Sequence, residues 1–312
     1  MMGYPVNRTL KSAAQCALAG LAAFALLGCG ASVASGNGEG ETNGVRIVSL
    51  NPCLDAILVE VAEPDQILAI SHYSHDPASS SIDAEIAERF AMTGGTAEEI
   101  IALSPDLVIA SSFIAPATLS ALDRLGVRVE TFGSPATLDE SLAQIDRLAK
   151  LTDRPAKGRA LQSRIMRAVP ILDPRALGSR AIGEDTDFDA LLWQPGQIVA
   201  GEATLVWEHL GRFGFQNHAA KQGLGQADHI SLEAIVANPP DLLLVAGNSL
   251  GQSHPMLTQL EDTRVVRFDP KLFYCGGPSI PKAWEQLEAI QNDMVLNPPG
   301  KEPAQDHGHH AH

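Results

Sequence analysis

The 312-residue sequence has little positive charge, few cysteines and few aromatic residues. Lysine and arginine number 22 against 37 acidic residues, and the formal net charge is −15. Because affinity for nucleic acid comes mainly from clustered lysine and arginine, this balance argues against a nucleic-acid partner. The sequence also lacks the long apolar runs of a multi-span membrane protein and the composition of a disordered or collagen-like chain. With 45% hydrophobic residues, it can bury one or two ordinary cores.

The N-terminus has the pattern of a secretory signal. Two basic residues precede an apolar run that is too short to span a bilayer, and the run leads into LLGC, which resembles the bacterial lipobox. We expect residues 1–28 to be a signal peptide, Cys29 to be lipidated, and the Gly- and Ser-rich residues 29–44 to form a flexible tether. The alternative is a plain signal cleaved among residues 31–35. The mature protein is thus expected in the periplasm, anchored to a membrane by lipid.

From Val45 onward, short apolar runs alternate with helical patterns, which is typical of an α/β fold with a largely parallel sheet. The predicted strands are 45–50, 66–71, 106–110, 127–132, 190–193, 241–245 and 265–268. The predicted helices outside the central segment are 54–61, 97–102, 116–125, 203–213, 232–237 and 280–293. Residues 138–172 stay helical apart from an interruption near Pro155, where a new helix is expected to begin.

An internal repeat supports a two-lobed plan. The segments that begin at Thr96 and Ser231 share a hydroxyl residue that can cap a helix, a glutamate two places on, a proline and then an aspartate that opens an apolar run, at a constant offset of 135 residues. We therefore predict two Rossmann-like lobes with central sheets, joined by a single long helix, with the ligand cleft between the lobes. The predicted domains are an N-terminal lobe over 45–137, a helical connector over 138–172, a C-terminal lobe over 173–296 and a disordered His-rich tail over 297–312.

Several segments, in this order, resemble a known class. They are RIVSLNPCLDAIL, ILAISHYSHDP, the repeated helix–Pro-Asp-Leu–strand unit, the central helix and GGPSIPKAWEQL. Together, over about residues 46–294, they resemble the periplasmic solute-binding proteins of ABC importers that carry cobalamin, haem and iron–siderophore complexes. The resemblance implies a monomeric, non-enzymatic protein without an intrinsic cofactor, whose ligand is a metal chelate and whose partner is an ABC permease dimer.

The cobalamin-binding members of this class provide the most detailed match. Their Ser-x-Tyr-Ser-x-x-Pro loop is matched here by Ser71, Tyr73, Ser74 and Pro77, which makes Tyr73 the first candidate ligand residue. One departure is the loop of residues 92–96, which has no tryptophan where those proteins pack one on the corrin ring. This departure lowers the expectation for cobalamin without removing it.

Ligands of open α/β sheets bind beyond the carboxyl ends of the strands, so the loops that follow the strands contain the candidate ligand residues. Aromatic rings in these loops suit a flat macrocycle such as a corrin or porphyrin. The candidates are Asn51, Pro52, Cys53, His72, Tyr73, His75, Phe113, Trp193, Phe273, Tyr274 and Cys275. The alternative for any one aromatic residue is ordinary packing.

Some of these side chains are also candidate metal ligands. His72 and His75 can ligate through a neutral ring nitrogen, and Tyr73 can bind the ferric iron of a haem. Cys53 and Cys275 are expected at opposite margins of the cleft, where they can form a disulfide, contact a soft metal or remain free thiols. Four further histidines are clustered in the C-terminal tail, a composition that binds transition metals loosely: His307, His309, His310 and His312.

The family resemblance also implies two acidic residues that dock onto arginines of the permease, one on each lobe. The matching positions are Glu98 and Glu233. Symmetry-related acids suit a dimeric permease. The alternative is that both glutamates only complement the macrodipole of the helix in whose first turn they lie.

Two other functions compete with this interpretation. The first is a free transition-metal-ion binding protein or chaperone that uses the His-rich tail. The second is a serine hydrolase, because Gly247 to Gly251 match the G-x-S-x-G nucleophile elbow with Ser249 at its centre. A hydrolase would also need an acid and then a histidine downstream, and only His254 and the tail histidines follow Ser249.

Overall fold

The computed structural model describes residues 44–169, 188–247, 249, 251–273 and 275–300. All of them belong to one compact unit that begins at Thr42. The predicted signal peptide, the lipidation site Cys29 and the tail histidines lie outside the described residues, as does nearly all of the predicted tether. Within the described residues, no helix is long and apolar enough to cross a bilayer.

The N-terminal lobe is built on a five-stranded parallel sheet in the order β3-β2-β1-β4-β5. Its strands are β1 (Ile47–Ser49), β2 (Ile67–Ser71), β3 (Met92–Thr93), β4 (Leu107–Ser111) and β5 (Val129–Phe132). Its helices are α1 (Pro52–Val61), α2 (Ala84–Ala87), α3 (Ala97–Ala102) and α4 (Pro116–Arg124), with short 3-10 helices η1 (Pro64–Gln66) and η2 (His72–His75). Both faces of the sheet are covered, which explains why its strands are apolar runs rather than alternating patterns.

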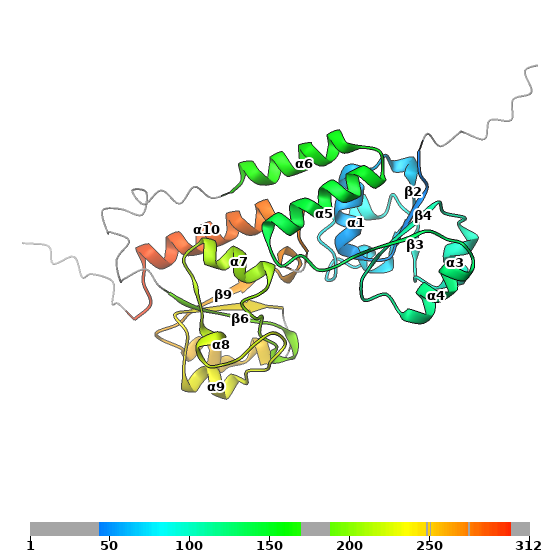
Figure 1. The fold of residues 1–312 in the computed structure, drawn as a ribbon. Helices are drawn as coiled ribbons and strands as arrows, with labels where there is room; N and C mark the ends of the chain where they lie inside the picture. The colour runs from blue at the N-terminus through cyan, green and yellow to red at the C-terminus, as the bar shows by residue number, and fades with distance from the viewer. Residues whose placement is uncertain (1–43, 170–187, 248, 250, 274, 301–312) are drawn as a thin grey trace, which may run out of the picture. The chain divides into compact units, whose positions relative to one another are not determined.

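Two helices follow this sheet, α5 (Leu138–Leu151) and α6 (Pro155–Arg167), and they pack against each other and against α1 (Figure 1). The turn between them contains Asp153, whose φ is 55°, and α6 begins at Pro155, where the missing N–H costs nothing. Gly158 permits the close approach, because a Cβ there would lie 2.4 Å from that of Ala149. Residues 138–167 of the predicted connector therefore form a helical hairpin, and residues 170–187, between α6 and the next strand, lie outside the described residues.

The C-terminal lobe is built on a four-stranded parallel sheet in the order β7-β6-β8-β9. Its strands are β6 (Asp189–Trp193), β7 (Gln216–Asn217), β8 (Leu242–Ala246) and β9 (Arg264–Phe268). Its helices are α7 (Leu205–Arg212), α8 (His218–Lys221), α9 (Leu232–Ala237) and α10 (Ile280–Leu296), with 3-10 helices η3 (Pro195–Gln197), η4 (Gly251–Ser253), η5 (Pro255–Gln259) and η6 (Pro270–Leu272). Figure 1 shows α7 and α10 on one side of this sheet and α8 and α9 on the other.

The predicted repeat is present in both lobes. Strands β4 and β8 begin 135 residues apart, as do β5 and β9. In each lobe the repeated aspartate caps the start of the neighbouring strand: the carboxylate of Asp106 accepts a hydrogen bond from the Arg46 N–H at 2.8 Å, and that of Asp241 accepts one from the Asp189 N–H at 2.7 Å. The fold class of two parallel α/β lobes is thus confirmed, whereas the two-residue strands β3 and β7 were not predicted.

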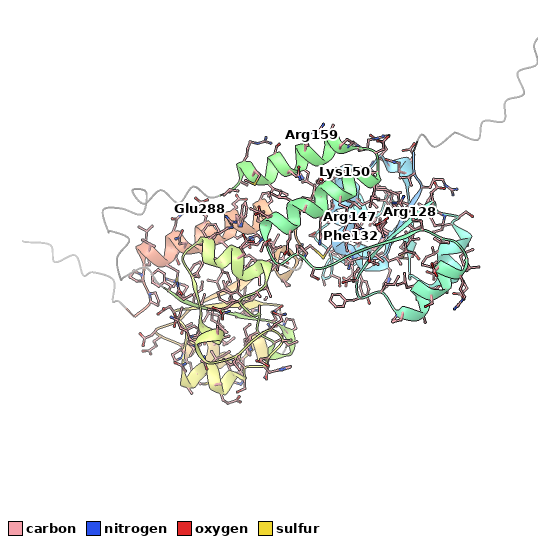
Figure 2. All side chains as sticks on the ribbon, in the orientation of Figure 1. Arg128, Phe132, Arg147, Lys150, Arg159 and Glu288 are labelled. Atoms are coloured by element: carbon pink, nitrogen blue, oxygen red, sulfur yellow. A yellow bond between two sulfur atoms is a disulfide. The ribbon has the colours of Figure 1, made fainter. Side chains whose placement is uncertain are left out.

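Side chains of the edge strand β5 contact charged side chains of its own segment and of α5. The Arg147 guanidinium lies 4.2 Å from the ring centre of Phe132, and Figure 2 labels both residues. Arg147 and Arg128 both form ion pairs with Glu130. These cations lower the pKa of Glu130, chiefly through the hydrogen bond from Arg128. Because the pairs are largely exposed, they contribute little to stability.

Candidate ligand-binding site

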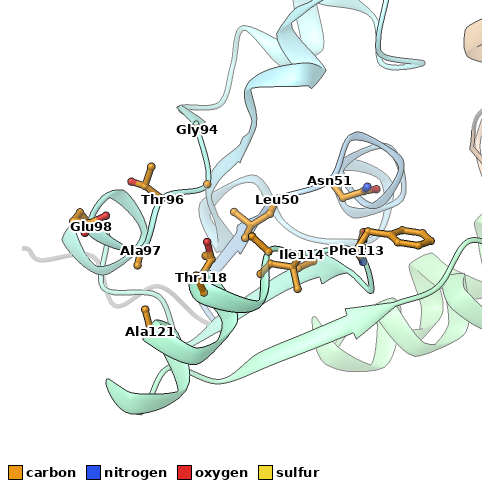
Figure 3. Close-up of a pocket in the computed structure, with 15 residues that line it drawn as sticks. Leu50, Asn51, Gly94, Thr96, Ala97, Glu98, Phe113, Ile114, Thr118 and Ala121 are labelled. Atoms are coloured by element: carbon orange, nitrogen blue, oxygen red, sulfur yellow. Dashed lines mark hydrogen bonds between the residues drawn. The ribbon is translucent and has the colours of Figure 1, made fainter. Parts of the chain in front are cut away.

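The main candidate pocket of the N-terminal lobe lies at the carboxyl ends of β1 and β4, and it has a volume of about 600 Å³. These adjacent strands lead to connections on opposite sides of the sheet, so the pocket occupies the topological switch point where open α/β sheets bind ligands. Its wall includes Asn51 after β1, Ser111 at the end of β4, and Phe113. Figure 3 shows Asn51 and Phe113 on one side of the pocket and Glu98 on the other.

A smaller pocket of about 80 Å³ shares Asn51, Ser111 and Phe113 with the first and is also lined by Cys53 and Cys275. Four of the predicted ligand residues therefore gather here. Asn51 also begins α1, since its side-chain oxygen accepts hydrogen bonds from the N–H groups of Cys53 and Leu54 at 3.0 and 3.2 Å. Pro52 is the first residue of that helix, so it contributes to the placement of both neighbours.

Cys53 and Cys275 form a disulfide, with an S–S distance of 2.10 Å and their Cα atoms 5.0 Å apart. Of the three alternatives that the sequence left open, the structure shows the disulfide. The other two, ligation of a soft metal by the thiolates and free thiols, were wrong. The two glycines that follow Cys275 also pack closely, Gly276 against α5 and Gly277 against α1. A Cβ at Gly276 would lie 2.4 Å from the Ser141 hydroxyl, and one at Gly277, whose φ is 102°, would lie 2.9 Å from Ile57.

The loop with the predicted Tyr73 follows β2 and forms η2. Tyr73 is 52% exposed, and its ring centre lies 4.0 Å from that of His72. A ring nitrogen of His72 lies 3.3 Å from the carbonyl oxygen of Thr93 in β3. His75 is half-buried, and its Nε2 atom is buried without a hydrogen-bond partner. These three residues line neither of the two pockets described above.

Asp55 is a buried carboxylate beneath this loop that sequence reasoning missed. It is fully buried in α1, and its Oδ2 atom accepts hydrogen bonds from the Ser71 N–H at 2.9 Å and the Ser74 hydroxyl at 2.6 Å. Burial raises the pKa of Asp55 to about 6, although the polar groups of Ser49, Ser74 and Ser71 oppose the increase. A sequence signal existed, because an aspartate within the apolar run LDAIL needs partners.

Two of the predicted aromatic ligand residues belong to the core instead. Trp193 is 1% exposed, because it lies on β6 between β7 and β8, and its indole N–H donates to the Ile230 carbonyl at 3.1 Å. Phe273 is buried and stacks on Phe268 with ring centres 4.0 Å apart. The prediction of stacking faces at these positions was therefore wrong. Tyr274 lies outside the described residues.

The predicted metal ligands do not form a recognisable site. Across the described ranges, no group of three or more histidine, cysteine, aspartate or glutamate side chains is arranged to hold a metal ion. The assignments of His72 and His75 therefore remain predictions about direct contact with a chelated metal. Those of His307, His309, His310 and His312 lie outside the described residues.

The two predicted docking acids are exposed and occupy equivalent helix starts. Glu98 lies in the first turn of α3 and Glu233 in the first turn of α9. The neighbouring Glu99 has the local structural role, since its carboxylate accepts hydrogen bonds from the Thr93 hydroxyl and the Gly94 N–H. The pKa of Glu233 is lowered by hydrogen bonds from its own N–H and from Ser231.

The serine of the hydrolase motif has a structural partner. The Ser249 hydroxyl donates to the Gln252 side-chain oxygen at 2.9 Å. The Gln252 amide in turn donates to the carbonyls of Trp193 and Ala246. Ser249 therefore helps to close the loop after β8, and no hydrogen bond to a histidine is formed by Ser249 in the described part of the chain.

Two parallel α/β lobes with a pocket at strand ends define a protein of the two-lobed binding class. A family model described as periplasmic binding protein matches residues 47–267, and the chain belongs to this family. A vitamin B12-binding protein of Yersinia pestis (strain Pestoides F) is 25% identical over 203 residues, which cover 65% of this chain and 69% of that protein. The family and this relative are binding proteins, not enzymes.

Solved structures share the fold. The apo form of the periplasmic heme-binding protein RhuT from Roseiflexus sp. RS-1 aligns with a TM-score of 0.62 and 23% identity, over 80% of this chain and 99% of that one. The periplasmic vitamin B12-binding protein BtuF of Vibrio cholerae aligns with a TM-score of 0.63 and 18% identity, over 81% of this chain and 98% of that one. At these identities the likeness extends to the fold alone.

Proposed function

We propose that this protein is the extracytoplasmic substrate-binding component of an ABC importer. It captures a metal chelate, either cobalamin or an iron complex such as haem or a ferric siderophore, and delivers it to a permease dimer. The observation that carries the proposal is the pocket at the carboxyl ends of β1 and β4, lined by Asn51 and Phe113. The proteins named above as vitamin B12-binding and heme-binding support this choice of ligand class.

Exposed aromatic rings support a flat, largely apolar ligand. Phe113 is 82% exposed and Tyr73 is 52% exposed, although both rings would gain free energy by leaving water. A macrocycle that stacks on such rings gains burial and aromatic contact together. In a haem complex the Tyr73 phenol oxygen can in addition bind ferric iron, which a corrin ligand would not require.

Placement at a membrane completes the proposal. Lipidation of Cys29 and a tether over residues 29–44 would hold the domain beside the permease at the membrane surface. The exposed Glu98 and Glu233 would then each meet a basic group of one permease subunit. The ligand is the cargo, and the protein needs no resident cofactor.

Isothermal titration calorimetry of residues 30–312 tests the proposal, with haemin, cyanocobalamin, a ferric hydroxamate and Zn²⁺ as separate ligands. We expect one chelate to bind in a one-to-one complex. Phe113→Ala and Tyr73→Ala should each weaken that binding by about tenfold, because each removes a stacking face.

The matched control is Leu125→Ala, which removes an exposed apolar side chain from the end of α4, outside both pockets. Its affinity should equal that of the wild type. Binding of Zn²⁺ alone, lost when residues 301–312 are removed, would contradict the chelate proposal and favour a metal-ion binding protein.

A further inference from the structure

The two most exposed positions of η2 lie between two anchored residues. His72 and Tyr73 are exposed, whereas the flanking Ser71 and Ser74 are each 2% exposed. The Asp55 carboxylate from α1 binds both anchors through one oxygen atom, at 2.9 Å from the Ser71 nitrogen and 2.6 Å from the Ser74 hydroxyl oxygen. Asp55 thus connects the two residues, Ser71 and Ser74, that flank the exposed His72 and Tyr73.

Two further hydrogen bonds of the loop are local. The Ser71 hydroxyl accepts from the Tyr73 N–H at 3.3 Å, and the Tyr73 carbonyl accepts from the Asp76 N–H at 3.2 Å. These two bonds stabilise the turn of η2 itself. From outside the loop, side-chain hydrogen bonds come from Asp55, and the His72 ring makes a longer 3.3 Å contact with the Thr93 carbonyl. Ser71 is also the last residue of β2 and pairs with Thr93 of β3, and η2 packs against α2, so Asp55 adds a polar anchor to a loop that already contacts its neighbours.

We propose that Asp55 is the positioning residue of the ligand loop, which holds Tyr73 and His72 in a preorganised orientation toward the bound chelate. The inference deepens the function proposed above and rests on it. A charge-assisted pair of hydrogen bonds within a dry interior is stronger than a neutral one, and a loop ordered before binding loses less entropy when the ligand arrives.

The first test compares Asp55→Leu, Asp55→Asn and Ser74→Ala in calorimetry with haemin and with cyanocobalamin. Asp55→Leu should weaken binding of the cognate chelate by about tenfold, because both anchors lose their acceptor. Asp55→Asn keeps an acceptor oxygen and should restore most of the affinity. The matched control is Ser79→Ala, which removes an equivalent hydroxyl–carboxylate hydrogen bond to Asp76 in the same loop, but at the surface.

A double-mutant cycle separates positioning from general destabilisation. If Asp55 acts through Tyr73 and His72, Asp55→Leu should cost almost nothing further in a His72→Ala/Tyr73→Ala background. Additive losses, or an unchanged affinity in Asp55→Leu, would overturn the proposal. A lowered melting temperature alone would not support it, because any buried substitution can produce that result.

Amide hydrogen exchange of the ligand-free protein provides a test that does not depend on the ligand. The Ser71 amide should exchange faster in Asp55→Leu than in the wild type, whereas amides of β8 in the other lobe should be unchanged. An equally slow Ser71 amide would overturn the anchoring role even if haemin binds. Fast exchange in a protein that binds none of haemin, cyanocobalamin and the ferric hydroxamate would support the anchor and contradict the proposed function.

Discussion

Two buried ionisable residues affect stability in opposite directions between pH 4 and 6. Burial raises the pKa of Asp55 to about 6, so the folded state binds a proton more readily than the unfolded chain does. The contribution of Asp55 to the stability of the folded state is therefore fully present at low pH and is lost as the pH rises from 4 to 6. Burial, aided by Arg212, lowers the pKa of His209 to about 4, so its contribution is lost as the pH falls from 6.5 to 4.

When either residue is substituted, the pH dependence of the free energy of unfolding should therefore show the contribution of the other residue. Each displaced pKa corresponds to about 3 kcal/mol of stability across this pH range. In Asp55→Asn the free energy of unfolding should rise with pH across this range more steeply than in the wild type. His209→Gln keeps an acceptor for the Trp284 indole N–H. In this variant the free energy of unfolding should fall, relative to that of the wild type, as the pH rises across the same range. Urea unfolding at several pH values measures both slopes, and parallel curves for all three proteins would contradict the assignment.

At the scale of elements, packing decides the effect of a glycine substitution more than helix propensity does. Gly158 and Gly211 both lie within helices, where alanine is intrinsically better by about 1 kcal/mol. A Cβ at Gly158 would overlap that of Ala149 in α5, whereas a Cβ at Gly211 would meet nothing within 4 Å.

We expect Gly158→Ala to destabilise the protein by about 1–3 kcal/mol, because α5 and α6 must separate. Gly211→Ala should leave stability unchanged or raise it by up to about 1 kcal/mol. Thermal unfolding of the two variants measures the difference. If both variants were stabilised, the close packing of the hairpin would be refuted.

The disulfide joins the first turn of α1 to the segment before α10. It closes a loop of 222 residues, for which the chain-entropy model gives a stabilisation of up to about 5 kcal/mol. The Cys53→Ala/Cys275→Ala double variant should lose much of this stability, and a thiol reductant should lower the melting temperature of the wild type toward that of the variant. The reductant should have no effect on the variant, which serves as the control. Identical melting with and without reductant would contradict a stabilising bond.

At the scale of the whole molecule, the proposed delivery depends on Glu98 and Glu233, one exposed acid on each lobe, of which Glu98 also lines the pocket of the N-terminal lobe. Glu98→Arg/Glu233→Arg should reduce uptake by at least about tenfold in cells or vesicles with the cognate permease, because two like-charge contacts replace two attractive ones. Because Glu98 lines the pocket, the single variant Glu233→Arg separates the two effects: it should reduce uptake and leave ligand affinity unchanged. The matched control reverses two exposed acids, one from α2 and one from α10, with Glu85→Arg/Glu285→Arg. Normal uptake by the first variant would refute the docking assignment.

Much of the fold follows from local patterns. Helices α3 and α9 begin and end where the capping hydroxyl, the glutamate and the proline predict, and the buried strands β4 and β8 follow the repeated aspartate. The two-residue strands β3 and β7 could not be predicted, because they are too short to show a period and form by pairing with longer neighbours. The same limit applies to η2, whose position depends on Asp55.

The sequence alone determined the periods, the caps and the repeat, since these depend on residues close together in the chain, and from them followed the two α/β lobes and the class of protein. Tertiary structure decided which strand-end side chains face a pocket. Asn51 and Phe113 do, whereas Trp193 and Phe273 are covered by their own lobe, because burial depends on neighbours that are distant in sequence. It also decided the pairing of Cys53 with Cys275 and the burial of Asp55 beneath the Tyr73 loop. Both require a distance between elements, and no local pattern encodes such a distance.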